Sequence, residues 1–270
     1  MKKKLMYAAA ILLFALAGFF AYQVISRQYQ IRKAESDNSK LREEVMSEND
    51  GFSDLRPGQT EGGDNEEKYV EDSLSGDITY RYSVDFDKLW ERNADACAWI
   101  DIPHTDMSFP IAQHPEDDNY YLERNFSGQK SIYGAAYIEL YNSRDFNDNV
   151  TVVYGHDISN GQWFGQLETI FTDPETFEKS KDIILYLPSE TRTYRVFAAL
   201  PYSDKHLMQS YDFTKKEVFE KFIEQILETR NINSIIRPED APEFGDRLLV
   251  LETCLKGDYS HRFLVLARKR

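Results

Sequence analysis

Between Lys4 and Arg27 the chain carries no charged residue. The stretch LMYAAAILLFALAGFFAYQVIS matches the roughly 20 residues with which an α-helix crosses a bilayer. Backbone N–H and C=O groups find no water in lipid, so a spanning segment must pair them internally, as a helix does. We therefore predict a transmembrane helix over residues 5–26, within an N-terminal segment 1–26 that starts with three lysines.

Cleavage of this helix as a signal peptide is the competing interpretation. Ala15-Leu16-Ala17 resembles a signal-peptidase site, but residues 18–25 stay mostly apolar where a cleaved peptide should turn polar. We therefore favour an uncleaved signal-anchor. The lysines at the start then stay in the cytoplasm by the positive-inside rule. This predicts a single-pass protein of the cell membrane with its N-terminus cytoplasmic and the bulk of the chain outside.

Residues 27–77 differ in composition from what precedes them. They are rich in Asp, Glu, Ser, Asn and Gly, and such a segment buries too little apolar surface to offset its ordering entropy. We predict a flexible acidic stalk, with a helix that continues out of the membrane through residues 27–46. The formal net charge of −14 also argues against nucleic acid as a partner, because a phosphate backbone needs a basic surface.

From Ile78 to Arg270 the pattern predicts one mainly β domain. Short apolar segments rich in Val, Ile, Tyr and Phe alternate with turn residues, which is typical of an antiparallel barrel or sandwich. The segments are CAWIDIP, SFPIAQ, SIYGAAYIEL, NVTVVYGHD, DIILYLP, TRTYRVFAALPYS, RLLVLETC and HRFLVLARK. Residues 188–190, Pro-Ser-Glu, predict a tight hairpin between two of them.

Two segments have helical rather than strand spacing. Residues 85–95 predict a short amphipathic helix, because Phe86, Leu89 and Trp90 share one face. Residues 212–231 predict a long helix whose apolar stripe packs on the β domain. Thr214 followed by Glu217 fits a capping box at its start.

Three residues at strand ends could carry chemistry together: Cys254, His156 and Arg262. A thiol is mostly protonated near neutral pH, so a nucleophilic cysteine needs a base or a cation nearby. His156 could supply either, and could later protonate a leaving amine. Arg262 could donate hydrogen bonds to a carbonyl oxygen that gains charge.

Simpler interpretations of these residues remain open. A cysteine at a strand end is commonly buried, and Arg262 could be a solvated charge. His261 competes as a partner for Cys254, and a disulfide between Cys254 and Cys97, the second of two cysteines, is a minor alternative. No Cys and His cluster has zinc spacing and no Gly-rich phosphate loop is present, so we expect no metal and no cofactor.

A resemblance to the sortases raises the weight of the catalytic interpretation. Residues 154–156 (Tyr-Gly-His), 251–254 (Leu-Glu-Thr-Cys) and 262–265 (Arg-Phe-Leu-Val) resemble the three-part signature of these membrane-anchored cysteine transpeptidases of Gram-positive bacteria. Further segments resemble class B members. They are Val84-Asp85-Phe86, Asn93-Ala94-Asp95, residues 98–103 (AWIDIP), 109–113 (FPIAQ), 119–122 (NYYL) and 160–165 (NGQWFG).

The resemblance implies a fold and a reaction. The fold is an eight-stranded β-barrel over residues 78–270, with an N-terminal helix and a long helix inserted between the sixth and seventh strands. In the reaction, Cys254 attacks a carbonyl in the C-terminal sorting motif of a secreted protein and forms a thioacyl enzyme. An amine, most often of a peptidoglycan precursor, then resolves it. His156 and Arg262 take the family's catalytic roles, and Cys97 falls on the first strand as a core residue.

Two residues depart from the family's pattern. Class B members commonly have Ser two positions before the cysteine, where this chain has Glu252, and Asn after the histidine, where it has Asp157. Alternate residues of a strand share a face, so Glu252 would disfavour a thiolate at Cys254. We expect Glu252, with Thr253 and Asp157, to contact substrate, and Glu252 to favour a basic motif residue; a solvated Glu at the groove rim is the alternative.

Rival functions share the same fold. A pilin-polymerising sortase would use a lysine of another protein as the acceptor. Class C polymerases of that kind often carry a second, C-terminal membrane helix, which does not follow the strand before Arg270. A plain cysteine protease would use water, and a catalytically silent, membrane-tethered binding module would need none of the three residues.

Overall fold

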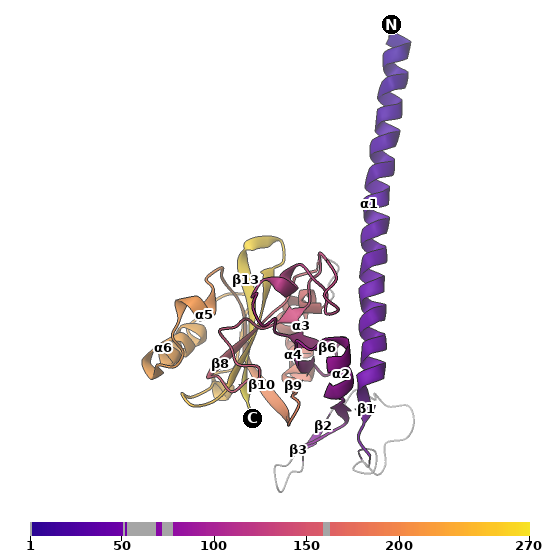
Figure 1. Ribbon diagram of the computed structural model, residues 1–270. Coiled ribbons are helices and arrows are strands. Elements are labelled where there is room, and N and C mark those ends of the chain that lie inside the picture. The colour runs from indigo at the N-terminus through magenta and orange to yellow at the C-terminus, as the bar shows by residue number, and fades with distance from the viewer. Residues whose placement is uncertain (1, 51, 53–68, 72–77, 159–162) are drawn as a thin grey trace. The chain divides into compact units, whose positions relative to one another are not determined.

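The computed structural model divides the chain into two compact units, Met1–Glu44 and Val45–Arg270 (Figure 1). It describes residues 2–50, 52, 69–71, 78–158 and 163–270. The residues of the 160–165 segment that precede Trp163 therefore lie outside the described part. The two units are described separately below.

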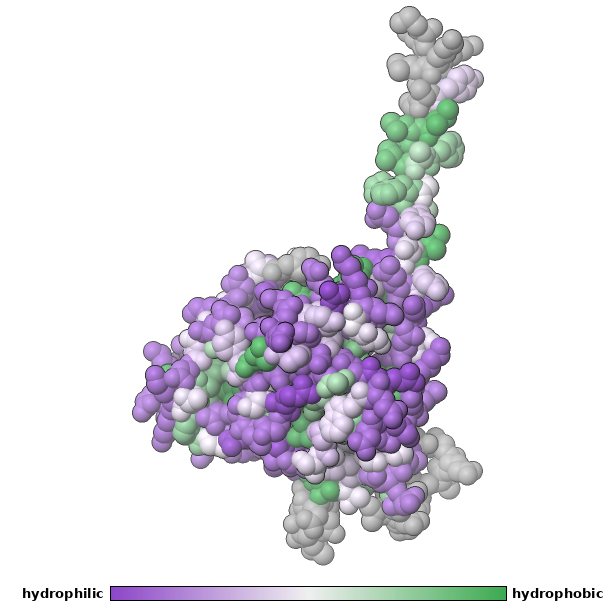
Figure 2. Space-filling view, in the orientation of Figure 1, coloured by the Kyte–Doolittle hydropathy of each residue, from purple (hydrophilic) through white to green (hydrophobic). Residues whose placement is uncertain are grey.

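The first unit consists of the helix α1 (Lys2–Val45) up to Glu44. Within α1 lies a stretch long and apolar enough to cross a membrane, and the side chains of that stretch are not buried by protein. Figure 2 shows this hydrophobic surface in green along the helix. A helix of this composition is compatible with the predicted signal-anchor.

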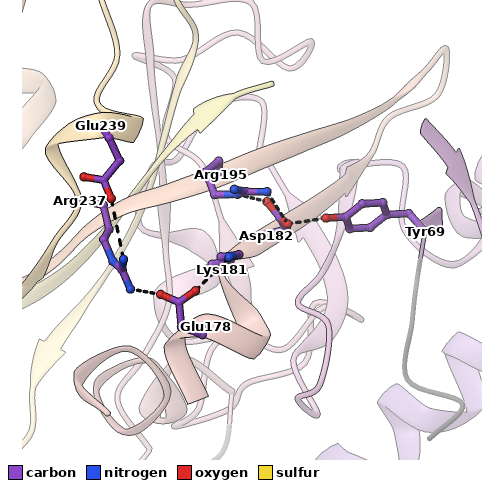
Figure 3. A network of polar contacts seen from close by, with 7 residues as sticks. All are labelled: Tyr69, Glu178, Lys181, Asp182, Arg195, Arg237 and Glu239. Atoms are coloured by element: carbon purple, nitrogen blue, oxygen red, sulfur yellow. Dashed lines mark hydrogen bonds and ion pairs between the residues drawn. The ribbon is translucent and has the colours of Figure 1, made fainter. Parts of the chain in front are cut away.

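The second unit begins with two small antiparallel pairings from the segment for which the sequence predicts a stalk. β1 (Met46–Glu48) pairs with β4 (Tyr82–Val84), and β2 (Tyr69–Glu71) pairs with β3 (Ile78–Tyr80). The Tyr69 hydroxyl donates a hydrogen bond to Asp182, which also accepts from Arg195 Nε at 2.5 Å (Figure 3). Short stretches of the acidic segment are thus tied to the folded domain by specific side-chain contacts.

Removing the Tyr69 hydroxyl should loosen this attachment. Burial and Asp182 raise the pKa of Tyr69 to about 12, so the hydroxyl keeps its proton and donates to a carboxylate. We expect Tyr69→Phe to lower the free energy of unfolding by about 1.5 kcal/mol in urea denaturation, since hydrogen bonds to charged groups contribute about 1.5–3 kcal/mol. Tyr80→Phe, which loses a 3.0 Å bond to the neutral Thr193 hydroxyl, is the matched control and should cost less. Equal losses would contradict the charge-assisted contact.

Eight strands form the predicted closed β-barrel. In chain order they are β5 (Ala96–Asp101), β6 (Ser108–Ala112), β7 (Ala136–Tyr137), β8 (Val150–Tyr154), β9 (Asp182–Tyr186), β10 (Thr191–Ser203), β12 (Leu248–Leu255) and β13 (Asp258–Lys269). They are ordered β10-β13-β12-β8-β7-β6-β5-β9, and β9 pairs again with β10, which closes the ring. Each predicted apolar segment supplies one of these strands.

Alternation along the strands gives the barrel two apolar faces. On β13, Phe263, Val265 and Ala267 belong to one buried cluster, together with Leu249 and Leu251 of β12. Leu264 and Leu266, between them in the sequence, belong to a second cluster. The second cluster includes Phe219, Phe222, Ile223 and Ile226 of α6 (Lys216–Leu227). One face of these strands therefore fills the barrel, and the other packs beneath α6.

The helices lie where the sequence and the resemblance place them, but both are shorter than the predicted ranges 85–95 and 212–231, and the start of the second differs. α2 (Phe86–Arg92) begins after Asp85, whose side chain accepts a hydrogen bond from the Lys88 amide. α6 falls between the sixth and seventh barrel strands, as expected. The predicted capping box is wrong: the N-cap of α6 is Lys215, and the Thr214 hydroxyl donates to Asp212 instead.

Shorter elements connect the barrel strands. They are η2 (Tyr120–Leu122), η3 (Trp163–Gln166), α3 (Leu167–Thr172), α4 (Pro174–Ser180), α5 (Leu207–Ser210), β11 (Ile235–Ile236) and η4 (Pro238–Asp240). β11 extends the sheet beyond the closed ring by pairing with β10. Of these elements, η2 contributes to the site described next.

Candidate active site

Cys254 and Arg262 face each other across the hairpin of β12 and β13. The antiparallel register pairs them directly, and directly opposite residues of antiparallel strands present their side chains on one face. The residues between them form a tight connection. β13 already begins at Asp258, so the turn is only Lys256-Gly257, with Gly257 at a φ of +80°. The hairpin thus places a thiol and a guanidinium side by side.

His156 follows β8, the strand on the other side of β12. β8 and β12 are parallel, and their last pair is Tyr154 with Glu252. Two residues further in the same register, His156 would stand opposite Cys254. The parallel register therefore directs the chain after β8 toward the end of β12 that carries Cys254.

The His156 ring is held from the side of η2. Its Nε2 lies 2.6 Å from the backbone carbonyl oxygen of Leu122. A carbonyl oxygen only accepts, so Nε2 carries a hydrogen, and Nδ1 is the ring nitrogen left to exchange a proton. Gly134, with a φ of +57°, lies against the same contact: a Cβ there would be 2.9 Å from His156 Cδ2 and 3.0 Å from the Leu122 oxygen.

The environment of Cys254 favours the protonated thiol. Partial burial raises the pKa of Cys254, Arg262 opposes that rise, and Asp157 and Glu252 add to it. A thiol in this state needs a base to remove its proton before it can attack a carbonyl. The neighbouring Arg262 would favour the thiolate once it forms.

Glu252 is buried under the thiol and contacts Arg262. Only 6 % of the residue is exposed, so the alternative of a solvated glutamate at the groove rim is wrong. Its Oε1 lies 3.6 Å from Arg262 Nε. Burial raises the pKa of Glu252 to about 7, although Arg262 lowers it; Glu139 raises it further. This carboxyl therefore changes its charge near neutral pH.

Thr253 and Asp157, which the sequence also predicts to contact substrate, have different surroundings from Cys254, Arg262 and Glu252. Thr253 is buried opposite Phe263, a residue of the cluster inside the barrel, so its side chain alternates away from the face of Cys254. Asp157 is half-buried, which raises its pKa, while Lys256 lowers it. Among the described contacts, no hydrogen bond joins Asp157 to His156.

The competing partners of Cys254 are engaged elsewhere. Cys97 and Cys254 are both free thiols, and the Cys97 thiol donates to the Ile111 carbonyl oxygen at 3.4 Å. His261 Nδ1 lies 2.8 Å from Asp258 Oδ2 on the exposed side of the hairpin. The disulfide is therefore absent, and His261 is occupied by a carboxylate.

Sequence reasoning missed a second polar pair on the same side of the sheet. Glu139, which follows β7, is 8 % exposed and lies 2.8 Å from His206 Nε2. Tyr154, whose ring stacks on Tyr137 at 5.5 Å, lies close to both and to Glu252. Tyr137 and Glu139 are two positions apart, and this spacing indicates that they share one face of a strand. The pairing of Glu139 with His206, which lies at the start of α5, is decided by tertiary packing.

Comparison with known proteins gives a consistent family. A family model for the sortase domain matches residues 100–270. The chain is 24 % identical over 208 residues to "Sortase B" of Listeria monocytogenes. The aligned region covers 74 % of this chain and 80 % of that protein. The match takes in the three residues of the candidate site, since all lie within residues 100–270.

Solved structures are similar over the same region. A mutant form of Clostridium perfringens sortase B matches with a TM-score of 0.61 and 26 % identity, over 69 % of this chain and 86 % of that chain. A class B sortase of Streptococcus pyogenes involved in pilus biogenesis matches with a TM-score of 0.58 and 23 % identity, over 68 % of this chain and 97 % of that chain. At this lower identity the likeness concerns the fold.

Proposed function

This chain belongs to the sortase family, and from that membership we propose that it joins the sorting motif of a secreted protein to an amine through a thioacyl intermediate on Cys254. The family makes it a cysteine transpeptidase of the class B type. The observation that carries the finer proposal is the direct pairing of Cys254 with Arg262. It is supported by the position of His156 just after β8, the parallel neighbour of β12.

The first half of the reaction acylates the enzyme. His156 takes the proton of the Cys254 thiol, and the sulfur bonds to a backbone carbonyl carbon of the motif. The oxygen gains negative charge and accepts hydrogen bonds from Arg262. The carbon–nitrogen bond then breaks, the leaving amine takes the proton from His156, and the acyl group remains on the sulfur.

The second half regenerates the thiol. An acceptor amine attacks the thioacyl carbon, a new carbon–nitrogen bond forms, and the carbon–sulfur bond breaks. The amine's proton passes to His156 and from there to the sulfur. We propose an amine of a peptidoglycan precursor as the acceptor. A lysine of a pilin is the second candidate, because one structural relative is involved in pilus biogenesis.

We place the catalytic domain, residues 78–270, outside the cell. The segment 5–26 then anchors the chain in the cell membrane, the lysines at its start stay inside, and residues 27–77 separate the anchor from the barrel. The apolar composition of α1 supports the anchor in this proposal.

Trapping the intermediate tests the function. The full-length chain in detergent micelles is incubated with a library of sorting-motif peptides, including basic and neutral variants, and mass spectrometry locates any acyl adduct. We expect the adduct on the peptide that contains Cys254, and its disappearance with formation of a new amide when a peptidoglycan stem peptide is added.

The choice of acceptor separates the rival functions. Transfer of the acyl group only to a lysine-bearing pilin peptide would show that the acceptor is a pilin and not a cell-wall amine. Release of the acyl group to water in the presence of both amines would indicate a hydrolytic protease. No adduct with any motif peptide would overturn the catalytic proposal in favour of a binding module.

A further inference from the structure

The carboxyl of Glu252 lies beside the arginine that the reaction needs. Glu252 and Cys254 are alternate residues of β12, and Arg262 stands directly opposite Cys254. The residue opposite Glu252 is Leu264, so the ion pair of Glu252 with Arg262 runs diagonally, away from the level of the thiol. Its 3.6 Å separation, Nε to Oε1, is an ion pair rather than a hydrogen bond.

Few groups around Glu252 can balance its charge. The titratable and charged groups that face it come from its own strand and from β7, β8, β10 and β13. They are Cys254, Tyr137, Glu139, Tyr154, Tyr202 and Arg262. Only Arg262 is a cation, and the acidic Glu139 already has His206 at 2.8 Å. Arg262 is therefore the group that an ionised Glu252 attracts.

The other carboxylate oxygen of Glu252 makes the ionised form costly. Oε2 is buried and accepts no hydrogen bond from the described residues. Burying a charged oxygen without a donor disfavours ionisation, which agrees with a pKa of Glu252 raised to about 7. Both the neutral and the ionised states of this carboxyl are thus accessible at ordinary pH.

We propose that Glu252 is a positioning residue for Arg262: its carboxylate draws the guanidinium away from Cys254, and its neutral form no longer draws it away from the substrate carbonyl. The inference rests on the function proposed above. The charge acts on the nucleophile in the same direction, because an ionised Glu252 also disfavours the Cys254 thiolate. Protonation of Glu252 therefore favours the thiolate and the oxyanion contact together.

The proposal predicts a pH-dependent difference between the wild type and Glu252→Gln, a neutral side chain of the same shape. Below the pKa of Glu252 both chains carry a neutral group and should have the same kcat/KM. Above it only the wild type carries the charge, so the variant should exceed it by roughly tenfold, the factor that corresponds to one unit of pKa at the thiol. The ratio of variant to wild type should rise with a midpoint near pH 7.

The measurement uses full-length chains in detergent, a motif peptide and an acceptor amine, from about pH 5.5 to about pH 9, around the Glu252 transition. Taking the ratio isolates the effect of the Glu252 charge, because the two chains differ only at that residue. Glu190→Gln is the matched control: it removes a carboxylate paired with Arg192 at 2.5 Å, next to the opposite end of β10, and its ratio to wild type should stay flat. Glu252→Ser, which restores the residue common in relatives, replaces Glu252→Gln if the latter does not fold.

Each outcome decides between the alternatives. A ratio that is flat across the pH range, or a wild type that exceeds the variant at alkaline pH, overturns the inference. A variant that is weaker by the same factor at every pH points to a structural role and also overturns it. If the wild type forms no acyl adduct on Cys254, the proposed function fails instead, independently of the ratio.

Discussion

Replacement of Cys254 by alanine should abolish both the acyl adduct and the transfer product, a loss on the order of 10³-fold or more, since the nucleophile and its partners act as a unit. The thiol is half-exposed and lies directly opposite Arg262, and the proposed mechanism makes it the nucleophile. The assay is the mass-spectrometric detection of adduct and amide product described above. Identical product profiles from the wild type and the variant would exclude the enzymatic function.

Cys97→Ala is the matched control for this substitution. Cys97 lies on β5 with 2 % exposure, and burial raises the pKa of its thiol to about 12, so it provides almost no thiolate. We expect Cys97→Ala to keep transfer activity and to cost about 1 kcal/mol of stability, the usual size for removing a small buried group. Loss of activity in a folded Cys97→Ala variant would show that the second thiol takes part.

Substitution of Gly134 by alanine should reduce transfer on the order of 10²-fold, because a displacement of about 1 Å at a reacting group can cost that much. The new Cβ would lie 2.6 Å from the Tyr121 carbonyl oxygen and 2.9 Å from His156 Cδ2, so the imidazole must move. The kcat should fall more than KM rises, since the motif still meets an unaltered β12–β13 hairpin. Steady-state kinetics with the motif peptide and the amine separates the two.

Gly128→Ala controls for backbone strain in the same loop. Gly128 also has a positive φ, +74°, but its Cβ would meet only the Tyr120 hydroxyl, at 3.2 Å. Both variants lose roughly 1 kcal/mol of stability from the left-handed conformation. Only Gly134→Ala should lose activity. Equal activities of the two variants would show that the contact of His156 with the Leu122 carbonyl, next to Gly134, does not orient the imidazole.

Much of the fold follows from local patterns. The apolar segments of the domain correspond to the eight barrel strands. Each strand buries at least one face, and this requires a short apolar segment that can be recognised in the sequence. The helix α6 was predicted in the same way, from the apolar residues that recur at helical spacing around Phe222. The error at its start arose because Thr214 hydrogen-bonds to the nearby Asp212, and a local side-chain partner competes with a helix cap.

The three proposed catalytic residues were found from their positions at strand ends and from the resemblance to the sortase signature, but their supporting contacts were not. Leu122 contributes only a backbone carbonyl to His156, and a main-chain atom has no residue type by which a sequence could reveal it. Glu252 was expected to meet the substrate because it shares a face with Cys254. Its burial depends on neighbours from other strands, among them Tyr154 of β8 and Arg262 of β13.

The amino-acid sequence alone determined the long apolar segment near the N-terminus, the order of strands and helices, and the candidate residues Cys254, His156 and Arg262, because each depends on periodicity or motif within a short stretch. Only the tertiary structure decided that Glu252 is buried against Arg262 and that His156 is held by a carbonyl of η2. The physical reason is that the desolvation of a charged group depends on how deeply it is buried and on which residues the strand register places beside it. Those neighbouring residues lie far apart in the sequence.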